Sequence, residues 1–256
     1  LAHYVPVLAA HPDVGVSVTG GAPCRPDTMT DLETYRETPI RDAVVESVPW
    51  ASASDVLVFL MGPYRLLDPS YLYPDDDYPL PPDPLAPESD DAAPDEIQAT
   101  LRTICQKVST ETKATVFIAS DVDIPTKRDV ATEELAEPGM AVIDQSVAFA
   151  KASDGNAFVF TKAGLTTGAG AEVGAVPEYF NLRKPAVRRR DPKTFCIFSE
   201  ADRSSGNQQT YEPKFSSASI DEMDDAYSLR FRYFADRKEL EDKLIDFIES
   251  YVVPIS

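Results

Sequence analysis

The chain has few of the residues that build metal centres, disulfide frameworks and membrane spans. Its 256 residues include only two histidines, His3 and His11, and three widely separated cysteines. These numbers argue against a Ser-His-Asp triad or a histidine-rich metal site in the body of the chain, and against a disulfide framework. No apolar run approaches the roughly 18 residues that span a bilayer, and no signal peptide is recognisable. We therefore expect a cytoplasmic protein that uses no metal or cofactor and no membrane.

Basic residues are also scarce, with 24 Lys and Arg against 43 Asp and Glu and a formal net charge of −19. The acids are dispersed along the chain, Asp outnumbers Glu, and Lys is rarer than Arg. This composition is typical of proteins that stay soluble in molar salt, where charge repulsion is screened. A mesophilic protein with a basic partner is the alternative. Nucleic-acid binding is disfavoured, because phosphate contacts need a basic face.

From Asp55 onward, short apolar runs alternate with helical patterns. The expected strands are 56–61, 115–119, 157–161, 194–198 and 229–234, and the expected helices are 95–109, 141–152, 169–179 and 237–251. Strands that alternate with helices imply a parallel sheet covered on both sides. We predict an α/β fold: a flavodoxin- or Rossmann-like five-stranded parallel sheet with helices on both faces. Ligands are then expected at the carboxyl ends of the strands.

Three regions do not follow this alternation. Residues 1–54 indicate an N-terminal extension, with one helix near 40–48, packed on an α/β domain of residues 55–256. The acidic, proline-rich segment 68–93 is either a disordered loop or a lid over the site. The polar, serine-rich segment 200–227 shows no pattern and is expected to lack regular structure.

The stretch Gly168 to Ala175, GAGAEVGA, follows the apolar run Ala157 to Phe160 and opens a helical pattern. Glycines let a backbone approach a ligand closely, and a helix N-terminus offers unpaired N–H groups and positive potential. We expect Glu172 in the first helical turn with a depressed pKa, as an ionised nucleophile or an acceptor for a sugar hydroxyl. The alternative is a helix that simply begins with glycines and carries a Glu that its dipole favours.

Three motifs are expected at neighbouring strand ends, and together they resemble the nucleoside 2-deoxyribosyltransferase superfamily. They are VFLMGPY, which ends in Gly62, Pro63 and Tyr64, then DQSVAFAKASD, which begins at Asp144, and TTGAGAEVGA, which contains Glu172. The MGPY turn, the Asp121-Val122-Asp123 segment and the QS…FA…S…AFV block also resemble a family of halophilic archaea. The resemblance covers about residues 55 to 250.

The resemblance implies a role for each matching residue. Glu172 is the nucleophile that attacks the anomeric carbon of a sugar, Asp144 orients that carboxylate or handles the proton of the base, and Tyr64 lines the pocket. Cleavage of an N-glycosidic bond needs a carboxylate for the oxocarbenium-like charge and a group for the proton of the leaving base. The remaining substrate-binding residues that we expect are Gly62, Pro63, Asp121, Asp123, Thr167, Gly168 and Gly170.

The turn before Glu172 departs from the family pattern. The family usually carries an Asp-Gly pair there, whereas this chain reads Lys162 to Gly168 without an acid. Lys162 near Glu172 is expected to lower the pKa of the carboxyl further, and Thr166 or Thr167 replaces only hydrogen bonding.

Other charged residues have both a functional and a structural interpretation. Asp121 and Asp123 follow an expected strand and either bind ribose hydroxyls or a divalent ion, or only solvate a loop. The basic cluster Arg188 to Arg190 either receives a phosphate or an acidic neighbour, or balances local charge. Asp154 is expected to be a turn residue.

Three classes of function remain open. The first is an N-glycosidase or deoxyribosyltransferase-like enzyme that acts on a nucleoside, nucleotide or dinucleotide through Glu172, with hydrolysis favoured over base exchange. The second is a non-catalytic nucleotide sensor, which the missing acid favours. The third is an interaction protein that uses its acidic proline-rich segment. Relatives of this fold often complete the pocket with a neighbouring subunit, so a homo-oligomer is a further possibility.

Overall fold

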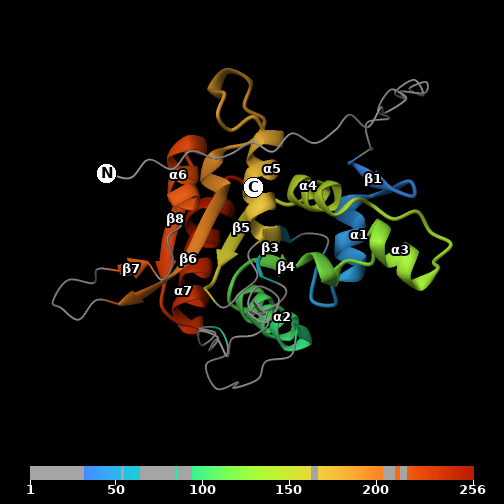
Figure 1. The fold of residues 1–256 in the computed structure, drawn as a ribbon, viewed down its shortest axis with the longest axis horizontal. Coiled ribbons are helices and arrows are strands. Elements are labelled where there is room, and N and C mark those ends of the chain that lie inside the picture. Colours follow the sequence, from blue (N-terminus) through green and yellow to red (C-terminus); the bar gives the residue numbers. More distant parts are fainter. Residues whose placement is uncertain are drawn as a thin grey trace, which may run out of the picture. The chain divides into compact units, whose positions relative to one another are not determined.

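The computed structural model describes residues 32–52, 55–63, 85, 94–162, 167–203, 211–213 and 218–256. Its centre is a sheet of five parallel strands, which are β3 (Val56–Met61), β4 (Ala114–Phe117), β5 (Gly155–Phe160), β6 (Phe195–Arg203) and β8 (Arg230–Phe234). They lie in the order β4-β3-β5-β6-β8, and the short β7 (Tyr211–Pro213) pairs antiparallel with the end of β6 (Figure 1). The predicted flavodoxin-like parallel sheet is therefore confirmed.

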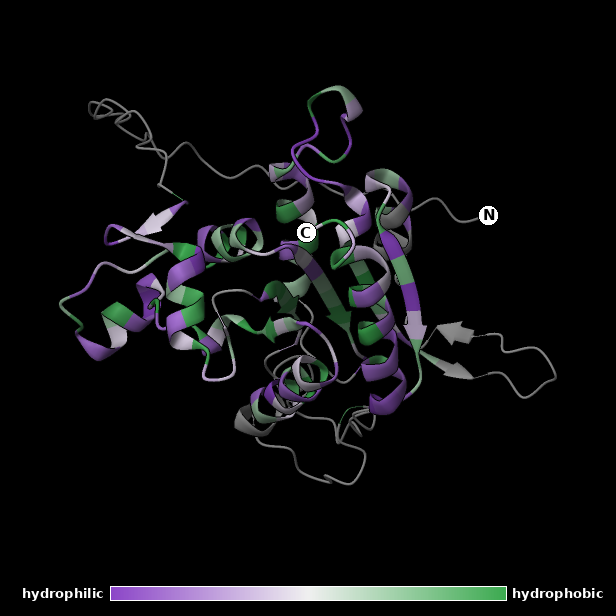
Figure 2. Cartoon of the chain, turned by 180° about the vertical axis from the view of Figure 1, so that it is seen from behind, coloured by the Kyte–Doolittle hydropathy of each residue, from purple (hydrophilic) through white to green (hydrophobic). Residues whose placement is uncertain are grey.

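The central strands read as continuous apolar runs because both of their faces are buried. Strand β3 has the sequence VLVFLM, and its residues from Leu57 onward are all buried. An alternating pattern would instead indicate a strand with one solvated face. Figure 2 shows the central strands in the colours of apolar residues, while polar residues lie on the outer sides of the helices.

Helices cover both faces of the sheet, as the sequence predicts. One face carries α1 (Ile40–Ser47), α4 (Val142–Ala152), α5 (Thr167–Tyr179) and α6 (Ala218–Tyr227). The other face carries α2 (Pro94–Glu111) and α7 (Arg237–Phe247), which continues as a π-helical turn over Ile248–Val252. Helix α2, which follows β3, therefore lies on one face of the sheet, whereas α4 and α5, which follow β4 and β5, lie on the other. This reversal makes the carboxyl ends of β3 and β5 the expected ligand-binding edge.

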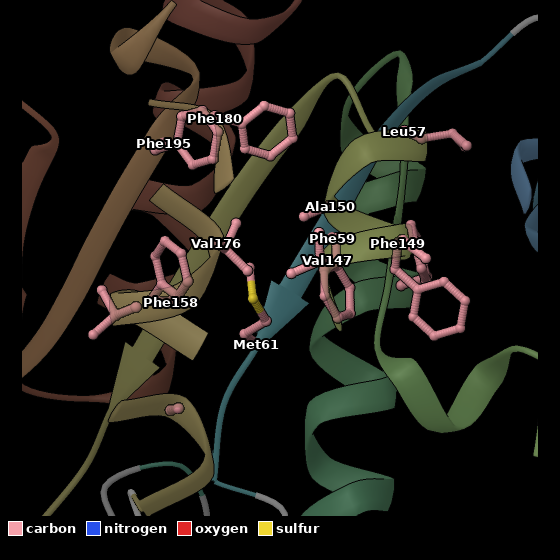
Figure 3. Packing of buried hydrophobic residues seen from close by; sticks show 14 of the residues in the cluster. Leu57, Phe59, Met61, Val147, Phe149, Ala150, Phe158, Val176, Phe180 and Phe195 are labelled. Carbon is pink, nitrogen blue, oxygen red and sulfur yellow. The ribbon is translucent and has the colours of Figure 1, made fainter. Parts of the chain in front are cut away.

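The larger core lies between the sheet and helices α4 and α5. Phe59 of β3 packs edge-on against Phe149 of α4, with ring centroids 5.6 Å apart. Figure 3 shows Met61 of β3 and Phe158 of β5 beside Val176 of α5. Burial of a large apolar side chain stabilises a fold by about 1.5–3 kcal/mol. This packing fixes α4 and α5, which carry the candidate site.

Residues 32–52 pack on the same core. Strands β1 (Thr34–Tyr35) and β2 (Thr38–Pro39) form a hairpin, and Arg36 and Glu37 in its turn have positive φ values of 50° and 70°. Ile40 and Val44 of α1 are buried in the cluster that α4 and α5 share. Earlier residues of the predicted extension lie outside the described part.

The expectation that residues 200–227 lack structure is wrong. Strand β6 continues to Arg203, β7 follows, and α6 runs from Ala218 to Tyr227. Tyr227 is buried and Met223 packs against the larger core. Burial of these few apolar residues in the core stabilises α6. The polar composition of the segment gives no helical pattern from which this helix could be predicted.

The acidic segment 68–93 contributes one described residue, Leu85, which is 2% exposed and belongs to the core beneath α2 and α7. The choice between a loop and a lid concerns residues outside the described part. Within the described ranges, no helix combines the length and the apolarity that a membrane crossing requires.

Candidate functional site

A cleft of about 520 Å³ lies beyond the carboxyl end of β4, between α3, α4 and α5. Its walls come from the loop that follows β4, from helix α3 (Lys127–Glu133), and from Val142, Gln145 and Ser146 at the beginning of α4. Glu172 of α5 also lines it. The cleft thus lies at the carboxyl edge of the sheet, beside the switch point between β3 and β5, and the residues directly after those two strands are not part of its described lining.

Glu172 is the buried carboxyl group of this cleft, with only 6% of the residue exposed. Its Oε1 accepts a hydrogen bond of 2.6 Å from the Ser146 hydroxyl. Its Oε2 is buried and has no hydrogen-bond partner among the described residues. A buried polar atom without a protein partner is costly, and a bound water, a ligand or a catalytic role accounts for such atoms. Asn156 Oδ1 and Ser199 Oγ share this property, but only Glu172 Oε2 belongs to a residue of the described cleft lining.

The predicted depressed pKa of Glu172 is wrong. Burial raises the pKa of this carboxyl from 4.5 to about 7, and the hydrogen bond from Ser146 offsets only part of that effect. Helix α5 begins at Thr167, so Glu172 lies in its second turn, whereas the influence of the helix dipole is confined to the first. Desolvation therefore decides the pKa.

Several local contacts hold the loop after β4 in place. Asp121 accepts hydrogen bonds from Arg102 of α2 at 2.6 Å and from the Ile118 backbone N–H at 3.2 Å. Gln145 of α4 donates from Nε2 to the Ile124 carbonyl at 2.6 Å. These contacts fix the wall opposite Glu172 before any ligand arrives.

The two aspartates of the Asp-Val-Asp segment have different surroundings. The side chain of Asp121 is only 2% exposed and pairs with Arg102, so its contacts are those of a structural residue. Asp123 is exposed and lines the cleft, and its backbone N–H donates to Ser47 of α1. Both residues also border an adjoining groove of about 830 Å³ beneath the β1–β2 hairpin.

Glu172 and Asp123 are therefore the predicted site residues that the cleft brings together. Asp144 lies in the first turn of α4, as expected, but it is not among the described residues that line the cleft. Gly62 and Pro63 are buried directly after β3, where a Cβ on Gly62 would meet Leu101 and Val159 at 3.6 Å. Tyr64 lies outside the described residues.

Packing among the described residues does not require the glycines before Glu172. A Cβ at Gly168 or Gly170 would meet no described atom within 4 Å, and both residues are exposed at the beginning of α5. Thr167 is the first residue of that helix. None of these three residues is among the described cleft lining.

The remaining charged residues have structural contacts. Asp154 accepts hydrogen bonds from the Leu57 backbone N–H and from Arg41, as befits the turn residue that the sequence indicates. Arg190 donates to the carbonyls of Ser153 and Lys151, which fixes it against the end of α4. The exposed Lys162 is not part of the described cleft lining.

The cleft is acidic. Besides Glu172 it is lined by Asp123, Asp129 and Glu133, which are exposed, and its described lining contains no Lys, Arg or His. Hydrogen bonds from the Thr126 hydroxyl and backbone lower the pKa of Asp129, so this residue is ionised. Across the described ranges, no three His, Cys, Asp or Glu residues are grouped as metal ligands.

Sequence reasoning did not assign a role to Ser146, Gln145 or Asp129. Ser146 and Gln145 are polar, yet they lie on the buried face of α4. A polar pair at core positions of a helical pattern is a signal that could have identified them. Asp129 follows Thr126 by three residues, and the two form a capping box at the beginning of α3.

The fold and site together define an α/β protein of the doubly wound class with a buried glutamate in an acidic cleft. Residues 41–253 match a family described as a domain of unknown function, DUF7509, and the chain belongs to this family. No curated protein and no solved structure matches the chain.

Proposed function

We propose that the cleft binds a nucleoside or a related small molecule and that Glu172 attacks the anomeric carbon to cleave or transfer its N-glycosidic bond. The observation that carries this proposal is the Oε2 atom of Glu172, which is buried, has no hydrogen-bond partner among the described residues and belongs to a residue that lines the cleft. The motifs around Glu172, which resemble the deoxyribosyltransferase superfamily, suggest the bond that is broken.

The chemistry needs a carboxylate beside the anomeric carbon, and burial strengthens its interaction with the charge that develops there. Breaking an N-glycosidic bond develops positive charge on the sugar, which a nearby carboxylate stabilises. Burial raises the pKa of Glu172 to about 7, so ionising this carboxyl costs more free energy than it does in water. A developing cation relieves that cost in the transition state, where the interaction accelerates the reaction.

Ser146 supports this role by holding one oxygen of the carboxyl group. Its hydroxyl donates to Oε1 at 2.6 Å, which leaves Oε2 as the atom that reacts. Both residues lie on helices that neighbouring apolar residues fix in the larger core, such as Phe149 of α4 and Val173 of α5. A nucleophile on a rigid element is held in a reproducible geometry.

The test is a chromatographic screen for released base with nucleosides, nucleotides and NAD as substrates. Molar KCl suits the acidic, halophile-like composition. Glu172→Gln is expected to lower turnover at least about a hundredfold while binding persists. Glu178→Gln is the matched control, because it makes the same change at an exposed position of the same helix. Equal rates for the Glu172→Gln variant and the wild type would refute the proposal.

The pH profile tests the form of Glu172 that reacts. A nucleophile must be ionised, so kcat/KM is expected to rise with pH through about 7, where this carboxyl loses its proton. A rate that falls over the same interval would assign Glu172 as a proton donor and contradict the nucleophilic role.

A non-catalytic sensor is the second candidate. It is favoured by the position of Asp144, which is not among the described cleft lining, and by the acid missing between Lys162 and Gly168. A sensor is expected to gain thermal stability with a ligand and to release no base. Release of base by the wild type and not by Glu172→Gln would eliminate this candidate.

A further inference from the structure

The charges in the cleft restrict the ligands that it can accept. Three exposed carboxylic residues, Asp123, Asp129 and Glu133, line it together with Glu172, and the described lining contains no basic residue to balance them. A phosphate group carries negative charge and is held in proteins by Arg, Lys or clustered backbone N–H groups. The described walls of this cleft supply no basic side chain for it.

The buried carboxyl group points to the same kind of ligand. Oε2 of Glu172 can accept a hydrogen bond or face a positive charge, and no described protein group does either. Unlike the exposed acids, Glu172 is only 6% exposed. Water therefore screens the charge of this carboxylate poorly. A cation beside Glu172 offsets the free-energy cost of burying its carboxylate, whereas an anion increases that cost.

We infer that the cleft selects an unphosphorylated N-glycoside whose base carries a positive charge. This inference rests on the proposed function and adds the charge class of the substrate. A neutral nucleoside is the second choice of such a cleft, and a nucleoside monophosphate is the least favoured.

A cationic base also removes the need for a proton donor. The Glu172 oxygen forms a bond to the anomeric carbon while the carbon–nitrogen bond breaks. The bonding electron pair goes to the ring nitrogen, which neutralises the positive charge of the base. Water then adds its hydroxyl to the anomeric carbon and releases a proton to solvent, and the carboxylate of Glu172 is restored. No acid is required at the leaving group, which agrees with the turn from Lys162 to Gly168 that lacks one.

The experiment compares two matched pairs of probes in titration calorimetry with the full chain at one fixed salt concentration. The pairs are nicotinamide riboside with its 5′-monophosphate, and adenosine with its 5′-monophosphate. Each riboside is expected to bind about tenfold more tightly than its monophosphate. Nicotinamide riboside is expected to bind more tightly than adenosine and to lose its base.

The double variant Asp123→Asn, Glu133→Gln tests whether the cleft itself causes this preference. It removes two exposed charges from the lining and is expected to reduce the riboside preference about fivefold. Glu111→Gln with Glu249→Gln is the control, because it removes the same charge from exposed positions that do not line the cleft. An equal effect of both double variants would assign the preference to net charge and overturn the inference.

The outcomes separate this inference from the proposed function. A monophosphate that binds as tightly as its riboside, with base still released through Glu172, overturns the charge rule and leaves the glycosidic function intact. Tighter binding of the ribosides without release of base supports the charge rule and contradicts the enzyme. Failure of all four probes to bind overturns both.

Discussion

Two buried glutamates lie on opposite faces of the same sheet, and their surroundings differ. Glu241 of α7 is 2% exposed and pairs with Lys107 of α2 and with Arg237 of its own helix. Glu172 of α5 is 6% exposed, and within the described part of the chain its hydrogen-bond partner is the neutral hydroxyl of Ser146. Burial is similar in the two cases, so burial alone does not mark a functional residue. The compensated glutamate joins two helices, whereas the uncompensated one lines a cleft.

The largest expected difference between the two glutamates is seen in the pH dependence of the free energy of unfolding of Glu172→Gln. The folded-state pKa of about 7 lies above the ordinary value of 4.5. Folding therefore favours the protonated form, and the wild type loses stability as pH rises from the lower value through the higher one. Relative to the wild type, the variant is expected to gain about 3 kcal/mol between about pH 4.5 and pH 9.

Denaturant unfolding of both proteins at the two ends of this interval measures the effect. The difference between the two pH values is informative because any constant effect of the amide cancels. A stability difference that does not change with pH would show that Glu172 titrates normally.

Glu241→Gln is expected to act in the opposite direction. The substitution weakens the contacts with Lys107 and Arg237, which are partly exposed, so we expect a loss of about 1–2 kcal/mol in the free energy of unfolding. Chemical denaturation measures this loss. Asp242→Asn, which affects an exposed pair with Lys238, is the control and is expected to change stability little. An unchanged stability in Glu241→Gln would contradict the structural role of Glu241.

Ser146→Ala has the smallest expected effect and acts on Glu172 directly. The Ser146 hydroxyl lowers the pKa of the carboxyl, so its removal is expected to raise that pKa further. Carbon-13 NMR of labelled glutamate follows the titration. Ser153→Ala is the control, because Ser153 is also a buried serine but donates to the Phe149 carbonyl at the end of α4. Equal pKa values of Glu172 in the two variants would show that the Ser146 hydroxyl does not lower the pKa of this carboxyl.

Much of the fold follows from local sequence patterns. The run Val56 to Met61 is apolar throughout, and the structure forms β3 over the same residues. The alternation with helices predicts a parallel sheet, and the single hand of its crossovers restricts the strand orders that are possible. The helix α6 could not be predicted in this way, because its burial depends on two or three residues that meet the core only after the chain has folded.

The candidate site was only partly predictable. Glu172 is recognisable from its position after a strand and a glycine-rich turn, but its pKa depends on where the helix begins and on what covers the carboxyl. Helix α5 begins at Thr167, and the cleft wall opposite Glu172 comes from the loop after β4. These contacts join residues far apart in the sequence, so no local pattern reports them. The polar Ser146 at a core position of a helical pattern indicates a buried hydrogen bond, but its partner Glu172 depends on how α4 packs against α5.

A direct titration of the Glu172 carboxyl tests the central claim that this group is buried without compensation. Carbon-13 NMR of glutamate-labelled protein, with the resonance assigned by its loss in Glu172→Gln, measures the pKa in the folded state. We predict a midpoint of about 7. A midpoint near the ordinary value of 4.5 would show that the carboxyl is compensated or solvated, and would contradict the account.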